Sequence, residues 1–393
     1  MKKKKKPEIR FEGFTDDWEQ RKLEDEAIEM LAGGDIDKSR VVESGKYPIY
    51  ANALTNDSIV GYYDDYYRVK APAVTVTGRG DVGHAQARTV DFTPVVRLLA
   101  IRSEHDAYFL ENAINNHGVI VESTGVPQLT VPQLGNYMIQ FPKTIEEETK
   151  IGEYFDNLDH LITLHQRKYE KLKNLKKSML KKMFPQKGCK VPGIRFSGFT
   201  DDWEQRKLGE ITELKSASRV HKEEWTTSGI PFYRSSDVMA AINGTKNEKA
   251  FISEELYEKL SDVSGKLEAG DVLITGGGSV GNPYIVPDNE PLYTKDADLL
   301  WIKNQGKFYP YFLYEFFFSP IFRNYLASIS HVGTIAHYTI TQLSDTPICL
   351  PSFEEQKKVG EYFQALDHLI TLHQRKVKIL KFIKKLLLEK MLV

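Results

Sequence analysis

The longest regular alternation of apolar and polar positions in the chain occurs twice, at residues 145–183 and 353–391. In both stretches apolar side chains recur at alternating steps of three and four residues. This spacing places them on one face of an α-helix and is typical of a coiled-coil seam. The alternative is a helix that packs only on its own domain, because imperfect heptads also occur on ordinary amphipathic helices.

Local signals agree with two long helices. Pro142 and Pro351 lie just upstream, acidic residues fill the first turn at 146–148 and 354–355, and Pro185 follows the first stretch. The predicted seam consists of Leu158, Leu161, His165, Leu172, Leu175, Met179, Leu366, Leu369, His373, Leu380, Ile383 and Leu387.

Two segments of the chain are written twice. The helical repeat, LDHLITLHQRK, is identical at residues 158–168 and 366–376. The aromatic repeat, residues 9–23 and 194–208, differs between its copies only at Glu12 and Ser197. Repeats in this order indicate two copies of one module, and therefore an internal repeat with approximate twofold symmetry.

The segments between the repeats share a weaker skeleton. Residues 44–50 correspond to 228–233, and residues 74–83 correspond to 272–281. In the second pair, β-branched residues run into a glycine cluster, which is typical of a strand that enters a tight loop. We therefore predict an α+β protein with two variable, mixed α/β and β-rich domains and two long helices that pair as an antiparallel coiled coil.

This reading divides the chain into six parts. They are a first conserved segment (1–23), a first variable domain (24–143), a first long helix (144–190), a second conserved segment (191–208), a second variable domain (209–351) and a second long helix (352–393). The seam from Leu158 to Met179 would span about 32 Å.

Composition adds few constraints. The chain has 393 residues, a net charge of −1 and two cysteines, which does not suggest a disulfide framework or a tetrahedral metal site. The basic N-terminus is not followed by an apolar run, and no apolar stretch is long enough to span a membrane, so we expect a cytoplasmic protein. Both variable segments are acidic, whereas residues 167–190 are strongly basic.

Motifs for catalysis by this chain are incomplete. Asn282-Pro283-Tyr284 lacks one proline of an adenine methyltransferase motif, and the glycines at 276–281 lack the Gly-Lys-Ser/Thr of a P-loop. Residues 287–288 and 355–357 spell only parts of a nuclease metal site. His160 and His165 are five residues apart, which does not align them for a metal ion. We expect no catalytic residue, metal ion or cofactor in this chain.

The second helix and the segment before it carry a family resemblance. EEQKKVGEYF at residues 354–363 continues into the helical repeat and is preceded by TQLSDTPICLP at 341–351. In this order, together with the duplicated modules, these motifs resemble the specificity subunits of type I restriction-modification enzymes over essentially the whole chain. The first copy departs from the pattern at residues 132–138 and has Glu148 where the second has Gln356.

The resemblance implies that each variable domain reads one half of a bipartite sequence in double-stranded DNA. It also implies that the helices set the spacing and dock two methyltransferase subunits. Methylation and cleavage, with S-adenosylmethionine, ATP and magnesium, would belong to those partners and to restriction (translocase) subunits of the full complex. Two alternatives remain open at this point: a coiled-coil interaction scaffold that binds no DNA, and a metal-dependent nuclease that acts alone.

Candidate DNA contacts lie in and near the glycine loops. Arginine can bind guanine edges, asparagine and glutamine can bind adenine, and hydroxyl groups can hold phosphate. The candidates are Thr77, Arg79, His84, Gln86 and Arg88 in the first domain, and Arg234, Ser235, Ser236, Ser279, Asn282, His337 and Tyr338 in the second. Because both domains are acidic, we expect the isolated chain to bind DNA weakly and to gain affinity from its partners.

Overall fold

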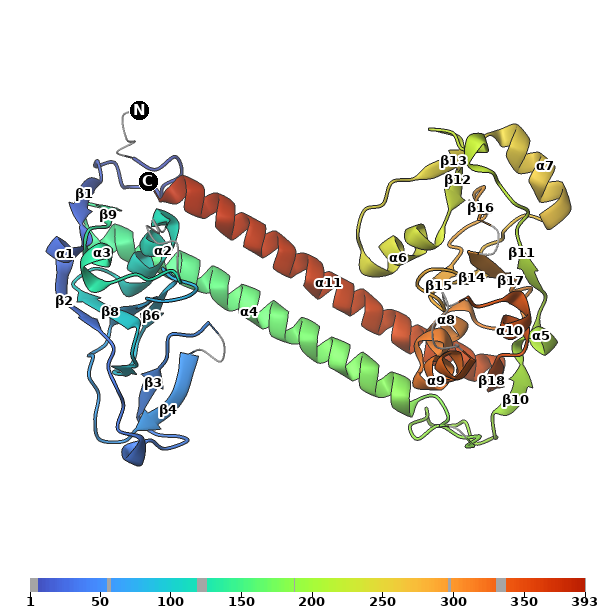
Figure 1. Ribbon diagram of the computed structural model, residues 1–393, viewed down its shortest axis with the longest axis horizontal. Coiled ribbons are helices and arrows are strands. Elements are labelled where there is room, and N and C mark those ends of the chain that lie inside the picture. The colour runs from blue at the N-terminus through green and yellow to red at the C-terminus, as the bar shows by residue number, and fades with distance from the viewer. Residues whose placement is uncertain are drawn as a thin grey trace. The chain divides into compact units, whose positions relative to one another are not determined.

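The chain folds into two compact units, which a computed structural model describes for residues 6–54, 58–118, 126–186, 188–295, 298–329 and 337–392 (Figure 1). Unit 1 comprises Met1–Arg167 and His373–Val393, and unit 2 comprises Lys168–Leu372. Each unit therefore contains one variable domain together with a part of each long helix.

The two long helices occupy the predicted stretches. Helix α4 covers Ile145–Lys182 and helix α11 covers Phe353–Met391. Both begin with glutamates in the first turn, where carboxylates favour the positive end of the helix dipole. None of the helices in the described ranges is both long and apolar enough to cross a membrane.

Unit 1 contains a four-stranded sheet in the order β2-β8-β5-β6, a three-stranded sheet in the order β4-β3-β7 and the pair β1-β9. The strands are β1 (Glu19–Lys22), β2 (Ala27–Ala32), β3 (Tyr47–Tyr50), β4 (Ile59–Tyr63), β5 (Ala73–Thr77), β6 (Ala85–Arg88), β7 (Thr93–Pro94), β8 (Leu98–Ser103) and β9 (Met138–Phe141). The short helices are α1 (Leu23–Glu26), α2 (Ala107–His117) and α3 (Val131–Gly135).

Unit 2 repeats this topology with sheets β11-β17-β14-β15 and β13-β12-β16 and the pair β10-β18. Its strands are β10 (Glu204–Lys207), β11 (Leu214–Ser216), β12 (Ile230–Tyr233), β13 (Ala250–Ile252), β14 (Val272–Thr275), β15 (Pro283–Ile285), β16 (Tyr293–Thr294), β17 (Leu299–Ile302) and β18 (Pro347–Leu350). Its helices are α5 (Leu208–Ile211), α6 (Ser235–Asn243), α7 (Glu254–Ser264), α8 (Pro310–Phe318), α9 (Pro320–Ile329) and α10 (Ile340–Ser344).

The weak skeleton predicted between the repeats is confirmed strand by strand. Residues 44–50 and 228–233 contain β3 and β12, which pair parallel with β7 and β16 respectively. Residues 74–83 and 272–281 contain β5 and β14, which are central strands of the four-stranded sheets. Both central strands are fully buried, which explains their β-branched, apolar composition.

The units differ mainly around the three-stranded sheet. In unit 1, β3 is followed by β4 and pairs with it in antiparallel register. In unit 2 the corresponding β12 is followed by α6, and β13 by α7, both clearly visible in Figure 1. The divergent sequences thus build different additions on one framework.

The aromatic repeat closes each domain on its own long helix. Its strand β1 pairs with β9, directly before α4, and β10 pairs with β18, directly before α11. The backbone N–H of Ile9 donates to the carbonyl of Lys390 in α11 at 3.1 Å, and that of Ile194 donates to the carbonyl of Lys182 in α4 at 2.9 Å. In each unit the repeat therefore bridges the start of one long helix and the end of the other.

Within each unit the two helices run antiparallel. In unit 1, His165 Nδ1 lies 2.9 Å from His373 Nδ1, and Lys384 Nζ lies 2.6 Å from Asp159 Oδ2. In unit 2, Lys176 Nζ lies 2.7 Å from Asp367 Oδ2. Of the twelve predicted seam residues, nine are buried or half-buried: Leu158, His165, Leu172, Met179, Leu366, His373, Leu380, Ile383 and Leu387.

The other three seam residues were predicted one residue too early. Leu161, Leu175 and Leu369 are 41%, 37% and 40% exposed. The residues after them, Ile162, Lys176 and Ile370, are less exposed, and Lys384, which was not predicted for the seam, makes a cross-helix ion pair. The seam contains lysine because its aliphatic stem packs along the helix while its ammonium group meets aspartate, which a hydrophobicity pattern does not register.

Candidate nucleic-acid interface

The two glycine loops have the same backbone architecture. Thr77 ends β5 and its hydroxyl donates to the carbonyl of Asp81 at 2.6 Å and accepts from His84 N at 3.0 Å. In unit 2 the hydroxyl of Thr275 donates to the carbonyl of Ser279 and accepts from Asn282 N at 2.8 Å. One threonine thus holds each hairpin loop from inside.

Glycine is required at two positions of each loop. Gly80 and Gly83 have φ angles of 76° and 84°, and their counterparts Gly278 and Gly281 have 67° and 77°. These values lie in the left-handed region that side chains with a Cβ rarely adopt. The glycine cluster therefore shapes a turn, and the positions around it are left for variable side chains.

The variable loop positions point to different chemistry in the two units. Unit 1 has Arg79, Asp81 and His84, of which Asp81 and His84 are exposed and lie 3.4 Å apart. Unit 2 has Gly277, an exposed Ser279 and a half-buried Asn282 at the same places. The loops therefore combine one shared framework with two different sets of hydrogen-bonding groups.

A groove of about 570 Å³ lies beside the first loop in unit 1. Thr77, His84, Gln86 and Arg88 line it, which brings together four of the five residues predicted for this domain. Gln86 and His84 are exposed, so their amide and imidazole groups can reach a ligand. Lys384, a helix residue that the sequence did not suggest, also lines this groove.

Two predicted residues in the first domain have structural partners. Arg88 is buried; its Nε donates to Thr75 Oγ1 at 3.0 Å and its guanidinium lies 3.7 Å from the ring centroid of Tyr50. Thr77 is also buried and holds the loop. Both side chains are thus already engaged by the neighbouring framework, although both also line the groove.

The predicted residues of the second domain fall into two groups. Ser279, Asn282 and His337 gather at the loop, since Tyr338 N donates to the carbonyl of Gly276 at 2.8 Å and so places the exposed His337 beside it. Tyr338 itself was wrongly predicted as a contact. Its side chain is only 1% exposed, because its aromatic ring packs in the core. Its hydroxyl group forms a hydrogen bond with the hydroxyl group of Thr346.

The remaining candidates lie at the start of α6. Arg234 pairs with Asp237 at 3.0 Å, Ser235 donates to the carbonyl of Asp298 at 2.9 Å, and Ser236 is exposed. The structure also adds Arg323 of α9, which the sequence did not single out. Its Nη2 donates to Asn282 Oδ1 at 3.2 Å, so a half-buried guanidinium orients the amide of the loop.

Buried ion pairs fix each domain to its helix. Arg10 donates to both carboxylate oxygens of Glu147, at 2.6 and 2.7 Å, and Arg195 donates to both oxygens of Glu355, at 2.7 Å each. Glu147 and Glu355 are each 1% exposed. This bidentate geometry sets the orientation of the aromatic repeat on the helix and explains why both copies keep it.

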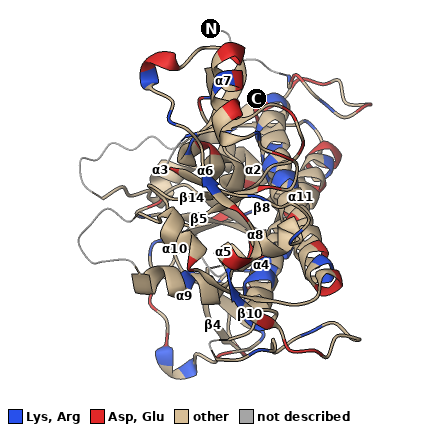
Figure 2. Ribbon diagram, turned by 90° about the vertical axis from the view of Figure 1, so that its right-hand side faces the viewer, with Lys and Arg blue, Asp and Glu red and all other residues tan. Residues whose placement is uncertain are grey.

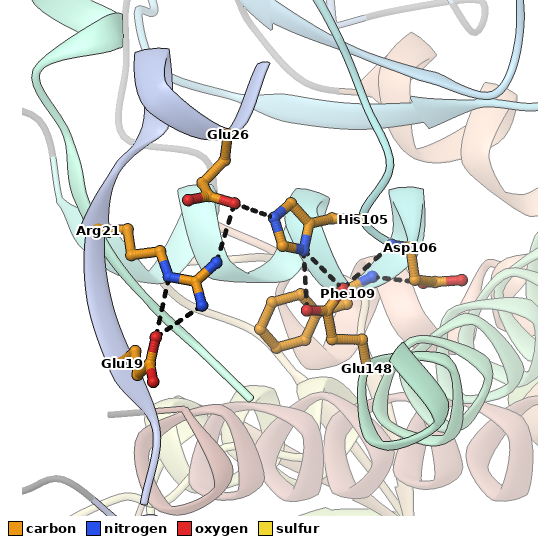
Figure 3. Close-up of polar contacts among 7 residues, drawn as sticks. All are labelled: Glu19, Arg21, Glu26, His105, Asp106, Phe109 and Glu148. Carbon is orange, nitrogen blue, oxygen red and sulfur yellow. Dashed lines mark hydrogen bonds and ion pairs between the residues drawn. The ribbon is translucent and has the colours of Figure 1, made fainter. Parts of the chain in front are cut away.

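A second connection ties unit 1 to its long helix (Figure 3). His105 Nδ1 lies 2.8 Å from Glu148 Oε1, and His105 Nε2 lies 2.9 Å from Glu26 Oε2. Burial lowers the pKa of His105, but its hydrogen bonds to Glu148 and Glu26 outweigh burial and raise that pKa above its ordinary value. The protonated imidazole can donate to both carboxylates at once.

Unit 2 replaces this connection with neutral residues. Gln356 stands for Glu148, the buried Phe308 for His105, and Ile211 for Glu26. Gln356 Oε1 accepts from Tyr309 N at 3.1 Å, just as Glu148 Oε2 accepts from Asp106 N at 3.2 Å. The change from glutamine to glutamate in the first module is therefore matched by a histidine that neutralises it.

Charge is distributed unevenly over the elements. Lysine and arginine recur along α4 and α11, as Figure 2 shows.

In the core of unit 2, Glu315 is fully buried and accepts a hydrogen bond from Lys176 Nζ at 2.8 Å. Burial raises the pKa of Glu315 above its ordinary value. In the described ranges, no three His, Cys, Asp or Glu side chains gather in a way that could hold a metal ion.

Known proteins share this sequence and fold. A type I restriction enzyme specificity subunit of Methanocaldococcus jannaschii (MjaVIII) is 24% identical over 273 residues, which are 67% of this chain and 63% of that protein. A putative type I restriction enzyme specificity subunit of Haemophilus influenzae is 28% identical over 172 residues, 42% of this chain and 41% of the relative. The match to each relative thus spans less than two thirds of its length.

Among solved structures, the type-I restriction-modification system S subunit from M. genitalium has the same fold, with a TM-score of 0.63, 16% identity and 99% of both chains covered. The family model described as type I restriction modification DNA specificity domain matches residues 15–174 and 200–381. Each match runs from the aromatic repeat through one variable domain into its long helix, which is the module that the repeats define. The chain therefore belongs to the type I restriction-modification DNA specificity family.

Proposed function

We propose that this chain is the DNA-sequence-recognition subunit of a type I restriction-modification complex, in which each variable domain reads one half of a bipartite target. The chain itself carries no catalytic group in this proposal, and works in the cytoplasm. Methylation and cleavage, with S-adenosylmethionine, ATP and magnesium, take place on partner subunits.

The glycine loops provide the observation that carries this proposal. Thr77 and Thr275 hold two loops of one backbone design, yet the variable positions carry Arg79, Asp81 and His84 in unit 1 and different residues in unit 2. A conserved frame with exchangeable hydrogen-bonding groups is what direct reading of two unlike base sequences requires.

The groove in unit 1 extends this surface. The amide of the exposed Gln86 can pair with adenine through its oxygen and its NH2 group. Lys384 supplies a cation for phosphate, although Asp159 neutralises part of its charge. Reading in unit 1 therefore combines the loop, β6 and the helix surface. The seam and the helices would set the spacing between half-sites and dock two methyltransferase subunits.

A loop exchange tests this function. Arg79→Gly, Asp81→Ser and His84→Asn together give the first loop the residues of the second, while Thr77, Gly78 and Gly83 keep the turn. We expect methylation in cells that also express the cognate methyltransferase subunit to change or disappear at one half-site only. Circular dichroism of the purified variant should match the parent chain.

The reciprocal exchange in unit 2 is the matched control. Ser279→Asp with Asn282→His, two of the three reciprocal changes, should affect the other half-site and leave the first unchanged. If both exchanges leave the methylated sequence as it was, the loops do not read DNA and the proposal is wrong.

The acidic variable domains lead to a second measurement. Phosphate neutralisation normally supplies most non-specific affinity, so the lone chain should bind DNA weakly and the complex with methyltransferase tightly. A filter-binding titration at physiological salt, with and without the partner, compares the two. Nanomolar binding by the lone chain would contradict this part of the account.

A further inference from the structure

Both helices of unit 1 carry exposed apolar side chains, which together are called the patch. Its members are Ile379, Phe382 and Leu386 of α11, which are 57%, 67% and 39% exposed, and Leu161 and Leu164 of α4, which are 41% and 39% exposed. The steps between these residues on each helix are three or four, so each set follows one face. The cross-links Asp159–Lys384 and His165–His373 place both sets at the same level of the pair.

The patch is separate from the seam that holds the pair together. Val377 and Met391 of α11 are 6% and 4% exposed, and Leu380 and Leu387 pack on the core of unit 1. Ile379, Phe382 and Leu386 belong to neither set. Three large apolar side chains on one helix face are therefore left for another surface to cover.

In unit 2, polar residues occupy the positions that correspond to Ile379, Phe382 and Leu386. Histidines 165 and 373 are 208 residues apart, and the same offset relates Ile379, Phe382 and Leu386 to Lys171, Asn174 and Ser178 of α4. Leu161 and Leu164 do have apolar counterparts in unit 2. These are Leu369 and Leu372 of α11, which are similarly exposed, at 40% and 37%. The two helix surfaces are thus equivalent in position and unequal in apolar character.

The surrounding charge indicates the kind of partner. Lys378, Lys381 and Lys385 are exposed on α11 around the apolar residues, and Arg167 and Lys168 follow Leu164 on α4. A second copy of this chain placed on the patch by a twofold axis would set lysine against lysine. A helix with an apolar face and acidic flanks would bury the patch and pair its lysines.

We propose that unit 1 offers the stronger of two unequal docking surfaces for a methyltransferase subunit, which contributes such a helix. This inference rests on the proposed function, because it assumes that the partner docks on the long helices. The complex then assembles in order, with one methyltransferase bound first on unit 1 and the second bound more weakly on unit 2.

The internal repeat supplies the test. Purified full chain is titrated with its cognate methyltransferase subunit, and native mass spectrometry counts the bound copies. We expect a one-to-one complex to accumulate first, with the two affinities at least about tenfold apart, since covering even one large apolar side chain is worth that much.

Two grafts identify the surfaces. Ile379→Lys with Phe382→Asn and Leu386→Ser gives unit 1 the residues of unit 2, and should lower the first affinity to the level of the second. Lys171→Ile with Asn174→Phe and Ser178→Leu should raise the second affinity to the level of the first. Both keep seam residues unchanged, and helical circular dichroism checks their folding.

The outcomes separate this inference from the proposed function. Two equal affinities in the parent chain, or grafts without effect on stepwise binding, overturn the inference and leave sequence recognition intact. Absence of any methyltransferase binding overturns both. Concentration-dependent dimers of the lone chain that the first graft abolishes would show that a second copy is the occupant, and would also overturn it.

Discussion

His105 has a carboxylate at each ring nitrogen, and this determines how the first domain responds to pH. Its pKa is raised, so the connection to Glu26 and Glu148 stabilises unit 1 below the ordinary histidine value of about 6.5 and is lost as pH rises through the raised pKa. Burial raises the pKa of Glu26, but bonds to His105 and Arg21 lower it overall. Its contribution is therefore lost only as pH falls through that lowered value.

Replacing the three residues by their unit 2 counterparts removes this dependence. In the variant Glu26→Ile with His105→Phe and Glu148→Gln, amide exchange in the first turn of α4 should stay constant, after correction for intrinsic rates, between about pH 6 and 9. In the parent chain, the corrected amide exchange in this turn should accelerate as the pH rises. The first turn of α11 is the internal reference, and an equal response of both turns in the parent would contradict the account.

The Arg10–Glu147 pair predicts a large effect of a single substitution. Arg10→Met leaves a carboxylate that is 1% exposed without its bidentate partner, so unit 1 should lose about 3–5 kcal/mol of unfolding free energy. Urea unfolding followed by circular dichroism measures this loss. The double variant with Glu147→Leu should recover most of it, and no recovery would show that the arginine acts through other contacts.

At the scale of elements, pattern alone predicted the long helices, the central strands and the glycine loops. These succeed because they rest on local rules: a helix period, β-branched runs and left-handed glycines. Of the twelve predicted seam residues, three are exposed instead of buried or half-buried. Leu161 and Ile162 are both apolar, and the choice between them depends on Lys384 and Asp159, which are 225 residues apart.

Residue roles in the site show the same limit. Tyr338 has a hydroxyl group suited to DNA and a ring suited to a core, and only the tertiary structure assigns it to the core. Arg323 contacts the second loop and Lys384 lines the groove beside the first, but both are distant from those loops in sequence. No local motif could therefore predict them. His105 likewise has no signal beyond the Glu148 departure that it neutralises.

The helix pair predicts a change in target spacing. Seven residues inserted into both helices, after Gln166 and after Gln374, keep the seam in register and add about 10 Å per helix. The spacer between half-sites should grow by about three base pairs, at about 3.4 Å each. Methylome sequencing reads the spacer directly, and an unchanged spacer would mean that the helices do not set it.

At the scale of the whole molecule, the repeated segments and the divergent segments have different roles. The aromatic repeat, the helical repeat and the buried arginine–glutamate pairs are kept in both modules, and they make the frame. The loops, the additions α6 and α7, and the outer residues of α11 differ. We propose that the first two differences select DNA and that the third orders assembly.

The most direct measurement exchanges one variable domain and keeps the repeats and the long helices unchanged. Residues 24–143 are replaced by the corresponding domain of a family member with a different target, and the methylome is sequenced from cells that express the chimera with its methyltransferase subunit. The account predicts that one half of the methylated sequence changes to the donor's half while the other half is retained. An unchanged methylated sequence would contradict it and would favour a scaffold that does not read DNA.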